Sequence, residues 1–170
     1  MQALMRLAMA LVVAFAASTV AAAEKIEIQD YCDPTDPSWK SVGGCLLKEG
    51  DVTRAEFGAL LNSVLSAAVV GHPAWRFEPS FVDTEPDRTV HVTNNGGRPH
   101  TFTEVAQFGG GMVPPLNKGL TEAPECANAT VLAPGDRVVL RGLAEGNHRF
   151  QCCIHPWMRA LIKVEAETDD

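Results

Sequence analysis

Short segments in which apolar and polar residues alternate recur along this chain, and they predict β-strands. The first covers residues 25–29 and reads Lys-Ile-Glu-Ile-Gln. From Phe77 onward, short apolar or alternating runs are separated by turn residues. The strand candidates there are residues 81–82, 89–93, 101–108, 137–140, 148–152 and 161–164. Short strands at such regular spacing predict an all-β sandwich or barrel.

Two longer stretches interrupt the strand pattern. Residues 30–50 contain Asp-Pro twice and Gly43-Gly44, a composition typical of a loop. Residues 109–130 begin with three consecutive glycines and include Pro114-Pro115. We expect this second stretch to be a loop insertion between strands.

One segment has a helical period instead. Thr53 and Glu56 have the spacing of a capping box. Apolar residues then recur at helical spacing, namely Phe57, Leu60, Leu61, Val64, Leu65, Ala68 and Val69. Gly71 and Pro73 end the pattern. This predicts one amphipathic helix, roughly residues 53–70, inserted after the first strand with its apolar face covering part of the sandwich.

The first 23 residues have the composition of a signal peptide. Arg6 precedes an almost unbroken apolar run over residues 7–20, and Ala21-Ala22-Ala23 fits a cleavage site after Ala23. An uncleaved anchor is the alternative, but the run is short for a membrane span of about 20 residues. We therefore expect a signal peptide at 1–23 and a single domain at 24–170. The mature protein would be periplasmic or secreted, without stable membrane insertion.

The charge balance and the cysteine count narrow the classes of function. A formal net charge of -7 argues against nucleic-acid binding and would favour a basic partner through steering. Export implies an oxidising compartment, in which cysteines can pair. The chain has five, at positions 32, 45, 126, 152 and 153. An odd number cannot pair completely within one chain, and a disulfide between Cys32 and Cys45 is the simplest way to close the first loop.

Candidate metal ligands are concentrated in residues 150–158. Cys152, His155 and Met158 follow the spacing Cys-x-x-His-x-x-Met, on a turn between two predicted strands. His100 follows the turn at 94–99 and can supply a second imidazole at the same end of the sandwich. Two imidazoles and a thiolate in a trigonal plane, with a weak axial thioether, are the ligands of an electron-transfer copper site. Cys152 as an ordinary structural cysteine, bonded to Cys126, is the alternative.

These motifs resemble cupredoxins of the plastocyanin, amicyanin and pseudoazurin type. The likeness is carried by residues 99–102, 133–136 and 146–152, and it covers 77–165 with 25–29 as a first strand. It does not extend to residues 30–75, which form the loop and helix insertion. The resemblance implies a Greek-key cupredoxin β-sandwich that binds one type 1 copper ion. Its ligands would be His100, Cys152, His155 and Met158, and the ring edge of His155 would lie near the surface.

Two positions depart from the pattern of the family. Thr101 stands where many members have Asn, and Cys153 stands where Thr is common. The usual hydrogen bonds around the ligand loop must therefore be replaced. A disulfide between Cys126 and Cys153 would brace the loop and leave Cys152 as the thiolate, although spacing alone does not determine the connectivity.

The resemblance implies an electron carrier, not an independent catalyst. It would transfer single electrons by Cu(II)/Cu(I) cycling as a monomer, with a redox partner such as a c-type cytochrome or a copper enzyme. Copper delivery or sequestration and a copper-free recognition domain are the alternatives. A multicopper enzyme needs further clustered histidines, and the chain has only five. Six residues, Met112, Pro114, Pro115, Leu116, Pro156 and Trp157, could form an apolar docking surface or simply pack the long loop.

Overall fold

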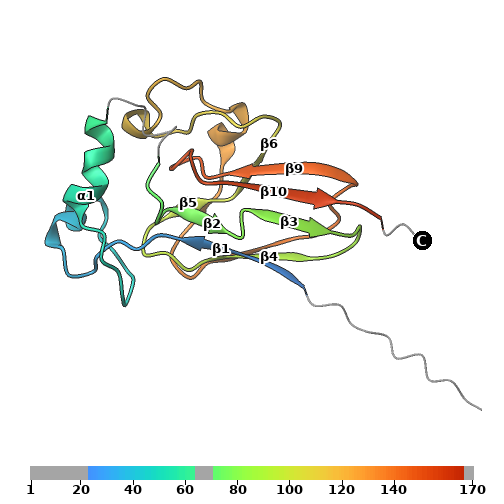
Figure 1. The fold of residues 1–170 in the computed structure, drawn as a ribbon, viewed down its shortest axis with the longest axis horizontal. Coiled ribbons are helices and arrows are strands. Elements are labelled where there is room, and N and C mark those ends of the chain that lie inside the picture. The colour runs from blue at the N-terminus through green and yellow to red at the C-terminus, as the bar shows by residue number, and fades with distance from the viewer. Residues whose placement is uncertain (1–22, 64–70, 167–170) are drawn as a thin grey trace, which may run out of the picture.

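The fold is a sandwich of two four-stranded sheets (Figure 1), seen in a computed structural model that describes residues 23–63 and 71–166. The strand order is β2-β1-β4-β8 in one sheet and β3-β10-β9-β6 in the other, and β5 pairs with β7 beside them. The strands are β1 (Glu24–Gln29), β2 (Arg76–Glu78), β3 (Phe81–Thr84), β4 (Val90–Asn94), β5 (His100–Thr101), β6 (Thr103–Val105), β7 (Val131–Leu132), β8 (Arg137–Leu140), β9 (Gly146–Gln151) and β10 (Arg159–Val164). The β-sandwich predicted from the sequence is confirmed.

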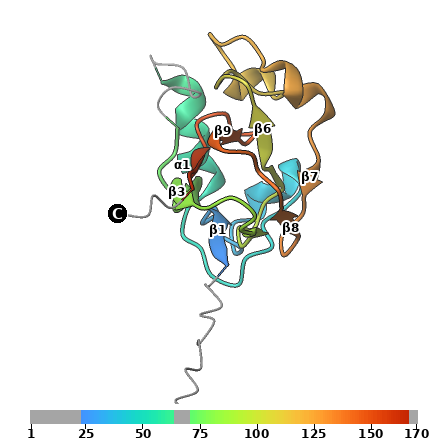
Figure 2. The ribbon, with the colours of Figure 1, turned by 90° about the vertical axis from the view of Figure 1, so that its right-hand side faces the viewer.

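Alternation along the strands builds the core between the two sheets. In β1 the buried residues are Ile26 and Ile28, and in β10 they are Ala160, Ile162 and Val164. β1 runs parallel to β4, and β10 runs parallel to β3 and antiparallel to β9. Figure 2 shows the sandwich from one end of its strands. Each sheet therefore turns one apolar face inward, as the period of two predicts.

Three phenylalanine rings fill the sandwich next to the predicted ligand loop. Phe102 stacks on Phe150 with 4.5 Å between ring centroids, and it meets Phe77 edge-on at 4.9 Å. Phe102 also separates β5 from β6, where a single strand was predicted. The chain changes its pairing partner here, because β5 pairs with β7 while β6 pairs with β9. The short strands β2 and β7 were not predicted from the sequence.

The insertion after β1 lies at one end of the sandwich (Figure 1). It contains the 3-10 helix η1 (Pro37–Val42), α1 (Arg54–Ala59) and the 3-10 turn η2 (Leu60–Asn62). The Thr53 hydroxyl accepts the Glu56 N–H at 3.1 Å, so the predicted N-terminal cap is present. The α-helix is shorter than predicted in the described range, and the rest of the prediction, residues 64–70, lies outside it. No helix in the described part of the chain is long and apolar enough to cross a membrane.

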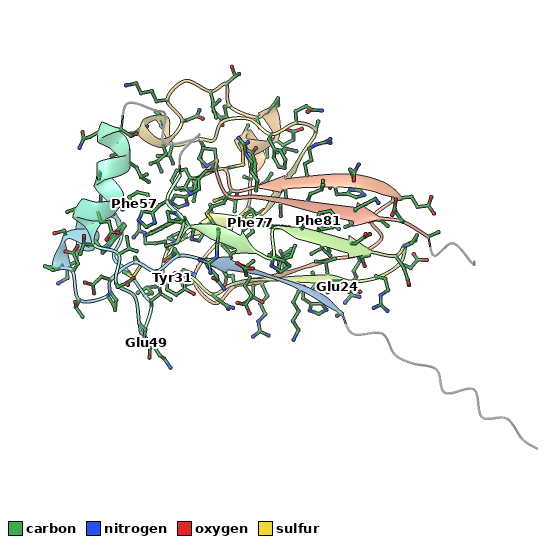
Figure 3. The ribbon with its side chains drawn as sticks, viewed as in Figure 1. Glu24, Tyr31, Glu49, Phe57, Phe77 and Phe81 are labelled. Atoms are coloured by element: carbon green, nitrogen blue, oxygen red, sulfur yellow. A yellow bond between two sulfur atoms is a disulfide. The ribbon has the colours of Figure 1, made fainter. Side chains whose placement is uncertain are left out.

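The apolar side of α1 packs on aromatic residues at the end of the sandwich. Phe57, labelled in Figure 3, lies 4.7 Å from Trp75 and 5.6 Å from Trp39 between ring centroids. The Trp39 indole N–H donates to the Val52 carbonyl at 3.1 Å, and the Arg98 guanidinium donates to two carbonyls of the same loop. The helix thus covers the end that carries the predicted ligands.

Both predicted disulfides are present. Cys32 is bonded to Cys45 within the first insertion, and Cys126 is bonded to Cys153. The long loop contains two 3-10 helices, η3 (Pro114–Leu116) and η4 (Pro124–Asn128). The second disulfide joins η4 to the residue that follows Cys152. Cys152 is the free cysteine of the described chain, and it is buried.

Candidate metal centre

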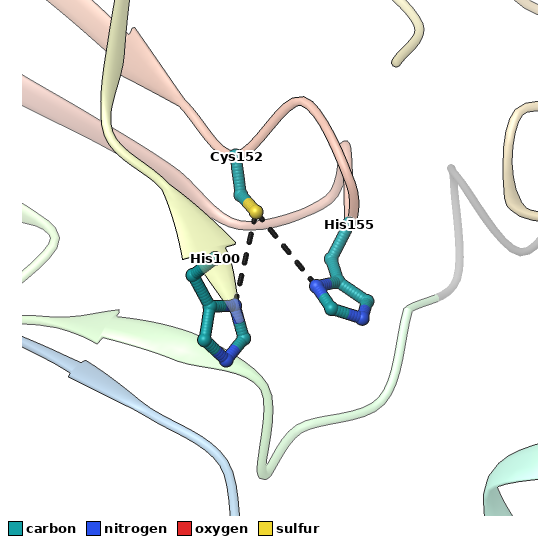
Figure 4. Close-up of side chains that lie close together, drawn as sticks. All are labelled: His100, Cys152 and His155. Atoms are coloured by element: carbon teal, nitrogen blue, oxygen red, sulfur yellow. Dashed lines mark hydrogen bonds between the residues drawn. The ribbon is translucent and has the colours of Figure 1, made fainter. Parts of the chain in front are cut away.

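Three of the predicted ligands converge on one point (Figure 4). The Cys152 Sγ lies 3.7 Å from His100 Nδ1 and 3.7 Å from His155 Nδ1. All three ligand atoms lie within 4.8 Å of one another, and all three residues are buried. His100 comes from the start of β5, whereas Cys152 and His155 come from the loop between β9 and β10.

These separations fit a single metal ion. Bonds of about 2.0 Å to nitrogen and about 2.3 Å to sulfur, at an angle near 120°, separate the two ligand atoms by about 3.7 Å. Both sulfur–nitrogen distances in the structure are 3.7 Å. The buried group could therefore hold a metal ion without rearrangement of the backbone.

Hydrogen bonds inside the β9–β10 loop bring Cys152, His155 and Met158 close together. The Cys152 N–H donates to the Met158 carbonyl at 3.0 Å, and the Met158 N–H donates to the His155 carbonyl at 2.9 Å. These bonds fold the loop into a tight turn and bring Met158 beside the two other loop residues. Met158 is only 1% exposed. The fourth predicted ligand therefore belongs to the same buried loop.

Thr101 and Cys153 brace this loop through a hydrogen bond between them. The Thr101 N–H donates to Cys152 Sγ at 3.4 Å, and the Thr101 hydroxyl accepts the Cys153 N–H at 2.7 Å. One residue of β5 is thus bonded to both neighbouring cysteines. The Cys126–Cys153 disulfide then anchors the loop from the other side.

His100 has a charged partner behind it. Its Nε2 donates to Asp30 Oδ2 at 2.8 Å, and neither side chain has any exposed surface. Burial works against protonation of His100, but the hydrogen bonds with Asp30 and Cys152 outweigh it and raise its pKa to about 9. Burial likewise favours the neutral carboxyl of Asp30, yet the bond with His100 leaves its pKa below the usual value.

His155 has aromatic neighbours instead. Its ring centroid lies 5.4 Å from that of Trp157, 6.1 Å from that of Phe57 and 6.3 Å from that of Trp75. The residue is 6% exposed, and burial lowers the pKa of its imidazole. Phe57 and Trp75 of the insertion pack around this imidazole, and the expectation that its ring edge lies near the surface stays a prediction. The ring lines a cleft of about 300 Å³ bounded by Trp39, Phe57 and the loop at 113–116.

The two histidines favour the thiolate form of Cys152. Burial by itself would raise the pKa of the Cys152 thiol, but hydrogen bonds with His100 and His155 hold it well below its usual value. The thiolate is the form of cysteine that ligates metals. The three donor atoms thus form a preorganised set.

The other histidines of the sequence stay outside this site. His91 is exposed, His148 pairs with Glu104, and the His72 ring packs against Phe57 and Trp75.

Asp30 is the site residue that the sequence analysis missed. It lies outside every motif and 70 positions before its partner. No local pattern could have found it, because Asp30 reaches the turn before His100 only through the parallel pairing of β1 with β4.

Five of the six apolar residues considered for docking separate into two groups, and the sixth, Met112, is partly buried against the cluster that contains the Cys126–Cys153 disulfide. Leu116 and Pro156 are buried, and the Trp157 indole N–H donates to the Trp75 carbonyl at 3.2 Å. Packing is the better interpretation for these three. Pro114 and Pro115 are exposed at the rim of the loop.

Comparison with known proteins finds similarity only among solved structures. No family model matches the chain, and no curated protein matches it. A purple cupredoxin from Nitrosopumilus maritimus is similar at 17% identity and a TM-score of 0.44, over 84% of this chain and 99% of that one. A reduced amicyanin variant is similar at 21% identity and a TM-score of 0.38, over 53% of this chain and 73% of that one.

A copper(I) amicyanin variant is similar to the same extent, at 20% identity and a TM-score of 0.38. The structural neighbours are therefore cupredoxins, the family that the ligand motifs resemble. Because these likenesses are distant, the fold rests on the strands described above, and the chemistry rests on the arrangement of the three donor atoms.

Proposed function

We propose that this protein is an exported type 1 copper protein of the cupredoxin family that carries single electrons. The observation that supports this most strongly is the convergence of one thiolate and two imidazole Nδ1 atoms in a buried site. Two histidines and a cysteine in a trigonal arrangement are the equatorial donors of blue-copper sites. We assign Met158 as the axial ligand, since it ends the same loop.

Copper bound there would supply a one-electron couple, Cu(II)/Cu(I). The residues of this chain hold the donors in place and exclude water. Thr101 fixes the cysteine loop, Asp30 fixes His100, and aromatic rings surround His155. A buried, braced donor set of this kind restricts solvent access and tunes the metal.

Electron exchange would occur with a redox protein, such as a c-type cytochrome or a copper enzyme. The proposed contact region is the cleft beside His155, because this histidine is among the residues that line it. Apolar clefts of this type favour burial of an apolar group from a partner. The location, periplasmic or secreted, rests on the signal-peptide composition of residues 1–23.

The test is the visible absorption spectrum of the protein after Cu(II) is added, compared with Cys152→Ser. We expect an intense band in the red that disappears in the variant, since it arises from the copper–thiolate bond. His91→Gln, which changes an exposed histidine, should keep the band. A folded wild-type protein without this band would remove the copper assignment.

A further inference from the structure

The partner of His100 comes from the insertion that cupredoxin motifs do not explain. Asp30 directly follows β1 and is 2% exposed, with no exposed surface on its side chain. A buried carboxylate is costly unless hydrogen bonds compensate for its lost hydration. Hydrogen bonds must therefore compensate for the lost hydration of the Asp30 carboxylate.

The carboxylate accepts four hydrogen bonds. Oδ1 accepts the backbone N–H groups of Cys32 at 3.4 Å and Gly97 at 3.0 Å. Oδ2 accepts the Arg98 N–H at 3.0 Å and the His100 Nε2–H at 2.8 Å. Donors from two distant segments thus fix the orientation of the carboxylate.

Close packing leaves this carboxylate little room to move. A Cβ atom on Gly96 would lie 2.2 Å from Asp30 Oδ2, so the turn can approach the carboxylate only because a glycine stands there. On the other side, a Cβ atom on Gly97 would lie 2.7 Å from the sulfur of Cys32 in the Cys32–Cys45 disulfide. The insertion and the turn before His100 are therefore fitted to each other around Asp30.

We propose that Asp30 is a positioning residue of the copper centre: it keeps the proton of His100 on Nε2, leaves Nδ1 for the metal, and stabilises Cu(II) relative to Cu(I) by its negative charge. This inference rests on the proposed function. A metal-ligating histidine is commonly oriented through its second nitrogen, and a carboxylate in this role also raises the basicity of the ligand.

Asp30→Asn tests the role with little change of shape. In either orientation of the asparagine amide, its NH₂ group would face N–H groups that donate to the carboxylate in the wild-type protein. Those hydrogen bonds would be lost. An amide can instead donate to His100 Nε2, but the ring proton then moves to Nδ1 and blocks the ligand atom. We expect Cu(II) affinity to fall by about 10- to 100-fold.

The same variant should raise the reduction potential. If Cu(II) affinity falls about tenfold more than Cu(I) affinity, the potential rises by about 59 mV for this one-electron couple. Asp51→Asn is the matched control, because it removes an exposed carboxylate from the same insertion. We expect Asp51→Asn to retain both the wild-type affinity and the wild-type potential.

A third measurement works without copper. In the metal-free and zinc-loaded wild-type protein, NMR should detect a slowly exchanging His100 Nε2–H, and Asp30→Asn should lose it. If Asp30→Asn does not fold, presence of this signal in zinc-loaded wild-type protein supports the proposal, and its absence overturns it.

The possible failures are distinguishable. Wild-type protein could show the red band while Asp30→Asn has the same Cu(II) affinity and reduction potential as Asp51→Asn. That result would overturn the role of Asp30 and leave the proposed function in place. If wild-type protein lacks the band, the proposed function fails, and the inference about Asp30 fails with it.

Discussion

The two imidazoles of the candidate centre have the same distance to Cys152 but opposite surroundings. His100 has a buried carboxylate on its second nitrogen, and its pKa is raised to about 9. His155 is enclosed by Phe57, Trp75 and Trp157, and burial lowers its pKa. One side of the site is built from charge and hydrogen bonds, and the other from aromatic packing.

Both environments depend on the same insertion, residues 30–75. It supplies Asp30 to one histidine and Phe57 and Trp75 to the other. The segment outside the cupredoxin resemblance is therefore part of the site. Its polar contribution should affect the metal, whereas its apolar contribution should mainly affect stability and access to His155.

The largest loss of stability is expected on the aromatic side. Phe57→Ala removes a 6% exposed ring that contacts Trp39, Trp75 and His155. We expect the free energy of unfolding to fall by about 3–5 kcal/mol, as for other buried phenylalanines. Chemical denaturation measures this change. Leu61→Ala, at a side chain with 40% exposure in the adjacent turn, should cost far less.

Phe57→Ala also tests whether the environment of His100 is independent of the aromatic environment of His155. The slowly exchanging His100 ring N–H should persist, because Asp30 is unchanged. Loss of that signal in a folded Phe57→Ala protein would show that the two environments are not independent.

A smaller loss of stability is expected at His148 and Glu104, a surface histidine–carboxylate pair like that of His100 and Asp30. His148 Nδ1 lies 2.6 Å from Glu104 Oε1, and half of the Glu104 side chain is exposed. Partial burial opposes protonation of His148, but bonds with the Ala144 carbonyl and Glu104 raise its pKa. Exposed pairs of this type contribute about 0–1 kcal/mol.

The sign of the pH dependence follows from that raised pKa. The contribution of the pair is fully present below the unfolded histidine pKa of about 6.5 and is lost as pH rises through the folded value. Glu104→Gln should therefore lower the melting temperature slightly near pH 6 and have no effect well above the folded pKa. If the melting temperature fell equally near pH 6 and well above the folded pKa, an ionic role of the pair would be contradicted.

Local patterns were sufficient to predict most strands, the capping box and the cysteine loop. β1 follows directly from its alternating residues and β8 from a short apolar run, and the proximity of Cys152 and His155 follows from their spacing within a single turn. Oxidising conditions and an odd cysteine count led to the disulfides that the structure contains. The strands, the helix cap and the cysteine loop depend on neighbours in sequence, whereas the disulfides were predicted from the cysteine count.

The surroundings of the ligands could not be predicted in the same way. Asp30 meets His100 only because β1 pairs in parallel with β4, and no local pattern specifies that register. Burial of His155 depends on where α1 packs, and its amphipathic stripe indicated only that some apolar surface had to be covered. Both contacts arise from tertiary packing between distant segments.

The central claim is that the site carries electrons and retains its metal, which one measurement tests directly. Copper-loaded protein would be reduced and reoxidised repeatedly in the presence of a competing Cu(I) chelator, while the red band is followed. We predict that the band disappears and returns fully in each cycle, and that the chelator stays copper-free. Transfer of copper to the chelator on the first reduction would contradict this account and indicate a copper-delivery protein.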